Sequence, residues 1–144
     1  MAVDSVQSLL RREEDEILHA YQDSLGYWSI SVGILIDERK GGGLRKEESD
    51  FILNNRLNIL RARLAWRYPW FSQLDEVRKA VVISMAWQDD QADLLDDWPH
   101  FLNAMAVRDY EQAAKEMLDS KVAREQAKAR WERQAEMMRS GKWV

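Results

Sequence analysis

The stretch "YQDSLGYWSISVG", residues 21–33, decides the fold class because it places strands in a chain that is otherwise helical in pattern. Apolar residues alternate with serine or glycine from Trp28 to Gly33, and a period of two is typical of a half-buried strand. A second apolar stretch, residues 34–36, precedes "DERKGGG", where three glycines end the regular structure. Since few residues are strand-like, we expect a small sheet attached to a helical protein.

Composition limits both the size of the fold and the chemistry available to it. With 144 residues, 46% of them hydrophobic, the chain can form one compact unit or two small lobes that share a long helix. The absence of cysteine and the presence of only two histidines leave carboxylates, hydroxyls and water for any reaction, and we expect no metal and no cofactor. A net charge of −4 disfavours nucleic acid as a partner.

Helical periodicity predicts the remaining elements. We expect a first helix from Ser5 to Ala20 and a long amphipathic helix over 45–66. A buried helix over 74–88 should have Asp75 as its N-cap, and Asp109 begins a capping box with Gln112. We expect Pro99 to break the carboxylate-rich stretch 89–105, and one charged helix to run from residue 123 to a stop near Gly141.

A carboxylate on the first helix and another in the hairpin suggest acid and base chemistry. Glu14 lies at the margin of the apolar stripe of its helix, where desolvation would raise the pKa of a carboxylic acid. Glycoside hydrolysis uses one such acid to protonate the leaving oxygen and a second carboxylate to activate water or attack carbon. The pattern alone is generic, because Asp23 could equally be a turn residue that bonds its own backbone.

Six residues in order and spacing resemble the active-site signature of the phage-type lysozymes, glycoside hydrolase family 24: Glu14, Tyr21, Asp23, Gly26, Ser29 and Gly33. Further stretches are similar to that family's interlobe helix ("LRKEESDFIL"), its central helix ("LDEVRKAVVISMAWQ") and its C-terminal ending ("MMRSGKW"). The resemblance covers about residues 5–143, nearly the whole chain.

The resemblance implies an α+β, mainly helical, lysozyme-like fold in a single domain, residues 1–144. A β lobe over 14–44 would carry the active-site hairpin, and a connecting helix over 45–66 would lead to a helical lobe. That lobe would consist of 67–144 together with 1–13.

The activity that the resemblance implies is inverting hydrolysis of the β-1,4 bond between N-acetylmuramic acid and N-acetylglucosamine in peptidoglycan. Glu14 would be the general acid, and Asp23 would orient the attacking water with help from Ser29, which stands where the family usually has threonine. Such inversion needs carboxyl groups about 6.5–9.5 Å apart. Tyr21 and Arg130 would support the site, with Arg130 paired to Glu14.

Substrate contacts and cellular context follow from the same resemblance. Leu35, Trp87 and Gln88 would contact sugar, and the partner would be the glycan strands of peptidoglycan. We expect a monomer, made in the cytosol without a signal peptide or stable membrane insertion, that acts on the cell wall after release and lyses bacteria.

Several alternatives stay open beside these assignments. Ser29 could be an ordinary strand residue, Tyr21 and Trp87 core residues, and Arg130 a solvated surface charge. A lysozyme-like module that binds saccharide or protein without turnover is the second hypothesis, and a purely structural helical domain is the third.

Departures from the family pattern support the second hypothesis, a binding module without turnover. Asp15 and Ser31 stand where the family usually has glycine, and Val122 where it usually has tryptophan. The stretch 89–97 is acidic and poor in glycine, which would weaken binding to an anionic cell wall. These substitutions would also fit an engineered member of the family.

Overall fold

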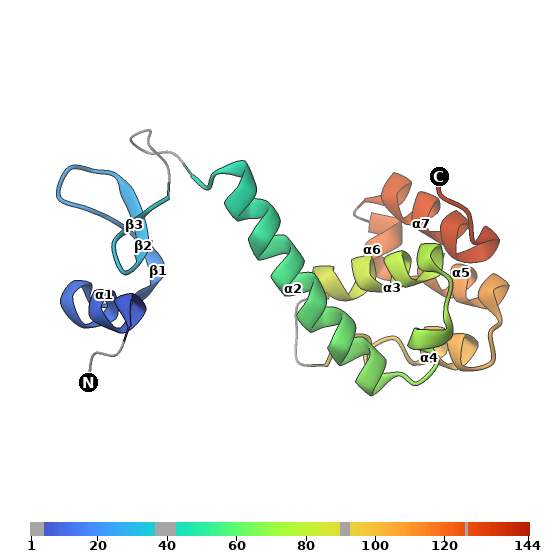
Figure 1. Cartoon of the computed structure of the whole chain (residues 1–144). Coiled ribbons are helices and arrows are strands. Elements are labelled where there is room, and N and C mark those ends of the chain that lie inside the picture. The colour runs from blue at the N-terminus through green and yellow to red at the C-terminus, as the bar shows by residue number, and fades with distance from the viewer. Residues whose placement is uncertain (1–4, 37–42, 90–92, 126) are drawn as a thin grey trace. The chain divides into compact units, whose positions relative to one another are not determined.

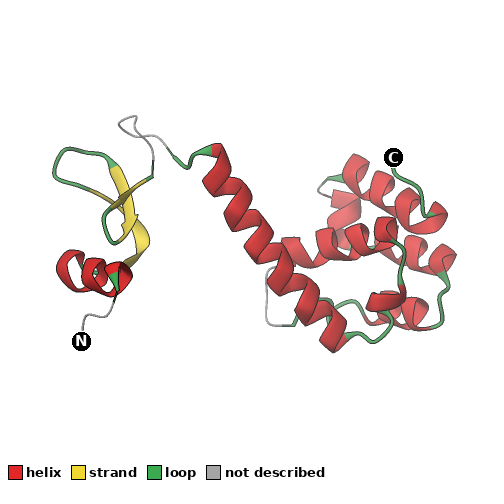
Figure 2. Ribbon diagram, viewed as in Figure 1, coloured by secondary structure: helices red, strands yellow, loops and turns green. Residues whose placement is uncertain are grey.

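The computed structural model describes residues 5–36, 43–89, 93–125 and 127–144, apart from the side chains of Gln88, Asp89 and Val122. Within these residues it contains seven α-helices, one short 3-10 helix and one three-stranded antiparallel sheet, so the fold is α+β and mainly helical, as predicted (Figures 1 and 2). None of the described helices is long and apolar enough to cross a membrane.

The chain divides into two compact units, Met1–Asn54 and Asn55–Val144, and each is described by itself. The boundary falls inside α2, which spans Lys46–Arg67 and so matches the predicted long helix to within one residue at each end. The proposed grouping of residues 1–13 with the helical lobe stays a prediction.

The first unit consists of α1 (Val6–Glu14), the sheet, and the first half of α2. The strands are β1 (Ile17–Gln22), β2 (Trp28–Ser31) and β3 (Ile34–Leu35), joined in the order β1-β2-β3. A capping box starts α1, because the Ser5 hydroxyl accepts from the Ser8 backbone N–H and the Ser8 hydroxyl accepts from that of Ser5.

The prediction that the first helix continues to Ala20 was wrong. The helix ends at Glu14, since Asp15 has φ 55 and ψ 119, a backbone conformation that no helix contains. The residues from Ile17 onward pair with β2 instead. The apolar residues after Glu14 keep a helical spacing although the helix has ended, so only the strand pairing shows where the helix stops.

The second unit contains the second half of α2, the 3-10 helix Phe71–Gln73, and the remaining helices. These helices are α3 (Glu76–Asp89), α4 (Pro99–Ala106), α5 (Tyr110–Leu118), α6 (Lys121–Glu125) and α7 (Lys128–Ser140). The centre of α3 is buried as predicted, with Val81 and Val82 at 1% and 0% exposure.

Helix ends in this unit follow local chemistry. Asp75 accepts from the Arg78 backbone N–H at 3.0 Å and Asp109 accepts from that of Gln112 at 3.0 Å, so both predicted N-caps are confirmed. The Gln112 amide donates to Glu116, so it does not complete a capping box.

Two helix boundaries differ from the prediction. Pro99 is the first residue of α4, a position where its missing N–H costs nothing, so it begins a helix and does not break one. The single C-terminal helix is divided into α6 and α7, with Ala127 in the left-handed region at φ 83.

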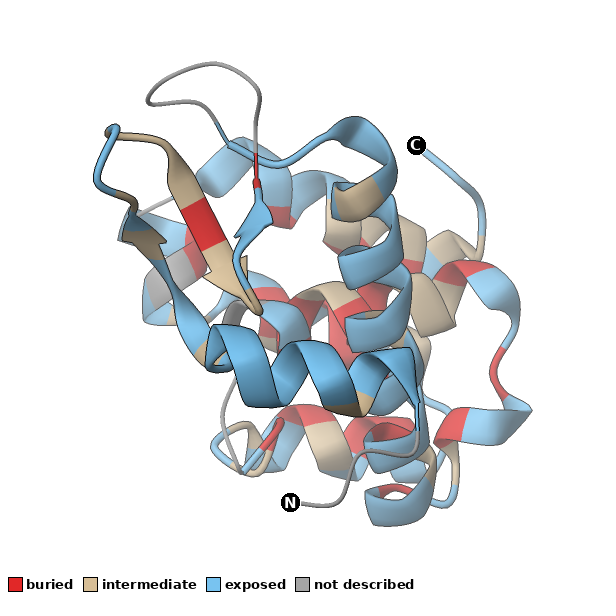
Figure 3. Ribbon diagram, turned by 60° about the vertical axis from the view of Figure 1, so that its left-hand side comes forward, coloured by how far each residue is buried: buried red, intermediate tan, exposed pale blue. Residues whose placement is uncertain are grey.

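The apolar core belongs almost entirely to the second unit. Its connected cluster of buried residues runs from Leu60 to Met138. Among the described residues of the first unit, only Ile36 and Ser29 are buried, and α1 buries none of its residues (Figure 3). The first unit must therefore rely on hydrogen bonds and turns more than on an interior of its own.

A hydrogen-bonded cluster fixes the end of α2 against the segment 93–98. The Tyr68 hydroxyl donates to Asp96 at 2.7 Å and accepts from the Leu95 backbone N–H at 3.0 Å, while Arg67 also pairs with Asp96. Burial, followed by the hydrogen bond to Asp96, raises the pKa of Tyr68 to about 12. The hydrogen bonds from Arg67 and then Tyr68 lower the pKa of Asp96.

Arg78 joins three helices of the second unit. Its guanidinium donates to the backbone carbonyls of Met138 and Arg139 at 2.7 and 2.9 Å, where α7 ends, and lies 3.8 Å from the centre of the Tyr110 ring. Gly141, at φ 68, closes α7 as predicted, and a Cβ there would lie 2.8 Å from Arg78 Nη1.

We predict that Arg78→Met lowers the free energy of unfolding by about 2–3 kcal/mol, because it removes charge-assisted hydrogen bonds from a guanidinium that is 15% exposed. Urea denaturation followed by circular dichroism measures the change. Arg124→Met is the matched control: its ion pair with Asp119 is exposed, and its loss should cost less than about 0.5 kcal/mol. Equal effects of the two substitutions would contradict the role of Arg78.

Candidate active site in the first unit

The three predicted catalytic residues lie in the same unit, close to the sheet. Glu14 is the last residue of α1, Asp23 follows β1, and Ser29 lies within β2. The helix end, the first turn and the central strand therefore each contribute one polar group.

Ser29 is the centre of a row of side chains that crosses the sheet. It lies opposite Tyr21 of β1 and opposite Leu35 of β3. Residues that face each other on neighbouring strands project from the same side of a sheet. Three of the residues assigned to the site, one catalytic, one supporting and one sugar-contacting, thus share one face.

The burial of Ser29 reverses what the alternating pattern suggested. Trp28 and Ile30 are only partly buried, whereas Ser29 is 5% exposed and is the only buried polar residue in the described part of the chain. In the described part of the chain, the buried side-chain atoms without a hydrogen-bond partner are Trp131 Nε1 and Gln134 Oε1. The Ser29 hydroxyl is not one of them, so the low exposure of this residue leaves no buried hydroxyl unsatisfied.

Glu14 lies beside the turn that joins β2 to β3. A Cβ built on Gly33 in that turn, where φ is 76, would lie 4.0 Å from Glu14 Oε2. The neighbouring arginines of α1 are paired elsewhere, Arg11 with Glu16 and Arg12 with Glu13. Among the described residues, Glu14 has no ion-pair partner and is exposed, so the described residues do not supply the desolvation predicted for it.

Asp23 uses one carboxylate oxygen to close the turn before β2. Its Oδ1 accepts from the backbone N–H groups of Leu25 and Tyr27, both at 2.9 Å. This is the turn role that the sequence left open as an alternative. The second oxygen, Oδ2, makes no hydrogen bond within the described residues, so the same side chain can fix the turn and still hold a water molecule.

The two departures from the family pattern in this unit share one backbone property. Asp15 has φ 55 and Ser31 has φ 59, values at which residues with a side chain are strained and glycine is not. The structure adds that both residues border the site in a conformation that glycine adopts without strain.

The remaining site residues belong to the second unit. Trp87, near the end of α3, is 42% exposed and is therefore not a core residue. Gln88 lies on the same helix, and its side chain is outside the described part of the structure. Arg130 is exposed on α7, and its pairing with Glu14 stays a prediction.

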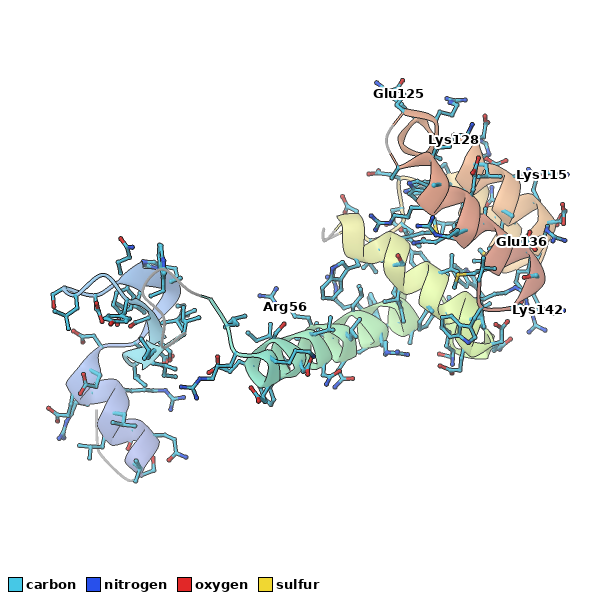
Figure 4. All side chains as sticks on the ribbon, turned by 90° about the horizontal axis from the view of Figure 1, so that it is seen from above. Arg56, Lys115, Glu125, Lys128, Glu136 and Lys142 are labelled. Carbon is cyan, nitrogen blue, oxygen red and sulfur yellow. The ribbon has the colours of Figure 1, made fainter. Side chains whose placement is uncertain are left out.

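Charged side chains are common on the surface of this unit. The labelled residues of α5, α6, α7 and the C-terminal segment stand out from the ribbon in Figure 4: Lys115, Glu125, Lys128, Glu136 and Lys142. A solvated surface charge therefore remains the alternative explanation for Arg130.

The acidic stretch 89–97 is only partly described. Asp93, Asp96 and Asp97 have described side chains, whereas that of Asp89 and residues 90–92 lie outside the described residues, as do residues 37–42 of the glycine-rich turn. The described residues contain no group of three or more histidine or carboxylate side chains that could hold a metal ion.

No family model matches the chain, and no curated protein matches it significantly. Any function of this chain is therefore inferred from its own residues and their geometry.

We predict that Asp15→Gly and Ser31→Gly each stabilise the protein by up to about 1 kcal/mol. Relief of left-handed backbone strain, about 1–2 kcal/mol, exceeds the extra conformational entropy that glycine loses on folding, about 0.5–1 kcal/mol. The measurement is the midpoint of thermal or urea unfolding. Ser24→Gly provides the control, since Ser24 lies in the turn after Asp23 without a positive φ and should gain nothing. A loss of stability in both glycine variants would show that the strain is not relieved.

Proposed function

We propose that the chain is a peptidoglycan hydrolase of the lysozyme type, which cleaves the β-1,4 bond between N-acetylmuramic acid and N-acetylglucosamine with inversion and lyses bacterial cells. Glu14 is the general acid in this proposal, and Asp23 and Ser29 hold the attacking water. Leu35, Trp87 and Gln88 contact the sugars, while Tyr21 and Arg130 support the site. The protein works as a monomer and needs no cofactor.

The observation that carries the proposal is the position of the Glu14 carboxylate and its lack of an ion pair within the described residues. Its carboxylate lies beside the β2–β3 turn, next to the strand that holds Ser29, while the arginines of its own helix are paired with Glu13 and Glu16. Glu13 and Glu16 are thus engaged in ion pairs with arginines of α1, whereas Glu14 makes no ion pair within the described residues. Glu14 therefore offers, at the end of α1, a carboxylate that is not paired within the described residues.

Asp23 and Ser29 supply what the second half of the reaction requires. A water that attacks the anomeric carbon must be positioned and lose a proton as the bond to the leaving oxygen breaks. The Oδ2 atom of Asp23 can accept that proton, since its Oδ1 is already fixed by Leu25 and Tyr27. The Ser29 hydroxyl can accept a second hydrogen bond from the same water.

A saccharide- or protein-binding module without turnover is the second candidate. The specific observation in its favour is the turn-closing role of Asp23, which accounts for that residue without any reaction. It predicts binding to peptidoglycan without the release of new reducing ends.

Glu14→Gln should reduce the release of reducing ends from purified peptidoglycan by about 10²- to 10⁴-fold, because the amide keeps the shape of the side chain and cannot donate the proton. Glu13→Gln is the matched control on the preceding residue, where the carboxylate already pairs with Arg12, and it should retain activity. Equal activity of wild type and Glu14→Gln would remove the hydrolase proposal.

Asp23→Asn separates the catalytic role of Asp23 from its role in the turn. The amide oxygen can still accept from Leu25 and Tyr27, so the unfolding midpoint should change little, whereas loss of the base should lower activity by at least about 10²-fold. Asp23→Ala should reduce both stability and activity. Full activity of a folded Asp23→Asn protein would assign the residue to the turn alone.

A further inference from the structure

We propose that a hollow beside Trp66 is a second binding site, which takes a neutral, hydroxylated sugar ring. It uses residues of the second unit only, and none of them belongs to the proposed active site. The choice of an N-acetylglucosamine oligomer as the natural ligand rests on the proposed function, whereas the sugar class follows from the site itself.

Trp66 is exposed in a way that the fold does not require. It lies near the end of α2 and is 84% exposed. The buried side of that helix is formed by Leu60 and Leu64, and Trp66 is turned away from it. A large indole surface left in water forgoes the stabilisation that burial would give it.

Three other tryptophans of this unit, Trp70, Trp98 and Trp131, have aromatic neighbours. Trp70 stacks on Tyr68 with 5.4 Å between ring centroids, and Trp98 stacks on Trp131 at the same distance. Two further tryptophans of this unit are exposed, but less than Trp66: Trp87 of α3 at 42%, and Trp143, which lies after the last helix, at 68%. Trp66 is thus an exposed indole held by a regular helix.

The indole borders a hollow of about 420 Å³. One wall is α2, with Ala62, Arg63, Trp66 and Arg67, and the other is the segment after α3, with Asp93, Leu94 and Asp96. Leu94 is 4% exposed, so the hollow has an apolar base. The volume falls within the range of small-molecule sites in proteins, about 300–1,000 Å³.

The polar groups around the hollow are fixed before any ligand arrives. Asp96 is held by Tyr68 and by Arg67, and Tyr68 is held by the Leu95 backbone. Within the described residues, Nη1 of Arg67 and the carboxylate of Asp93 make no side-chain hydrogen bond. A donor and an acceptor therefore remain available next to the aromatic surface, with little ordering left to be done on binding.

The charges of the hollow select the class of ligand. Among its described lining residues, two arginines, Arg63 and Arg67, are balanced by two aspartates, Asp93 and Asp96. A phosphate or a quaternary ammonium group would meet as much repulsion as attraction there. A pyranose ring is neutral, places its C–H groups against a flat indole, and offers hydroxyls to both carboxylate and guanidinium.

Titration of the ¹⁵N-labelled full chain, carrying Glu14→Gln to prevent turnover, with the N-acetylglucosamine tetramer tests the proposal by NMR. The indole N–H signal of Trp66 is assigned as the signal missing from a Trp66→Phe variant. We expect a saturable shift of this signal and no shift of the Trp143 signal. Asp93→Ala should weaken the binding that produces the shift by about fivefold, which corresponds to one hydrogen bond of about 1 kcal/mol.

Cellotetraose, inorganic phosphate and choline serve as comparison ligands. A shift of the Trp66 signal with cellotetraose supports a site for neutral sugars in which N-acetyl groups are not required. A larger shift with phosphate or choline than with either oligosaccharide overturns the assignment to sugars. No response of Trp66 to either oligosaccharide overturns the site, whatever the activity of Glu14. Conversely, a response of Trp66 combined with equal lysis by wild type and Glu14→Gln leaves this site standing and removes the hydrolase.

Discussion

Burial is distributed very unequally along this chain, and the rest of the structure depends on that constraint. The helices of residues 55–144 enclose a continuous apolar core, and Arg78 joins the start of α3 to the end of α7 and to Tyr110. The first unit buries only Ile36 and Ser29 among its described residues. Its polar groups are therefore placed by turns, capping bonds and strand register, each worth about 1 kcal/mol, and not by packing.

A site held in this way is sensitive to local backbone chemistry. Asp23 closes its turn with one oxygen and leaves the other open, so one residue serves structure and, in the proposed reaction, catalysis. Gly33 keeps a tight turn beside Glu14, whereas Asp15 and Ser31 adopt positive φ with side chains attached. Local strain of this kind is common around functional groups, where geometry matters more than stability.

Features that depend on neighbouring residues were predictable from the sequence. Asp75 and Asp109 cap helices because a carboxylate there reaches a free N–H three residues on, and Gly141 ends α7 because it tolerates φ 68. The prediction that the first helix reaches Ala20 was wrong, because Ile17 pairs in the sheet with Ser31, fourteen positions later. Two helix boundaries were also not predicted from the sequence: Pro99 begins α4, and Ala127 separates α6 from α7.

The sequence by itself determined the mainly helical class, the long helix 45–66, the small sheet, and the choice of Glu14, Asp23 and Ser29 as candidates. Each of these follows from periodicity, from the spacing of residue types or from the family resemblance. Only the tertiary structure decided that Tyr21, Ser29 and Leu35 form one row, that Ser29 is the buried member, and that Trp66 stands beside a hollow. Register, burial and exposure arise from contacts between segments distant in the chain, and no local pattern contains that information.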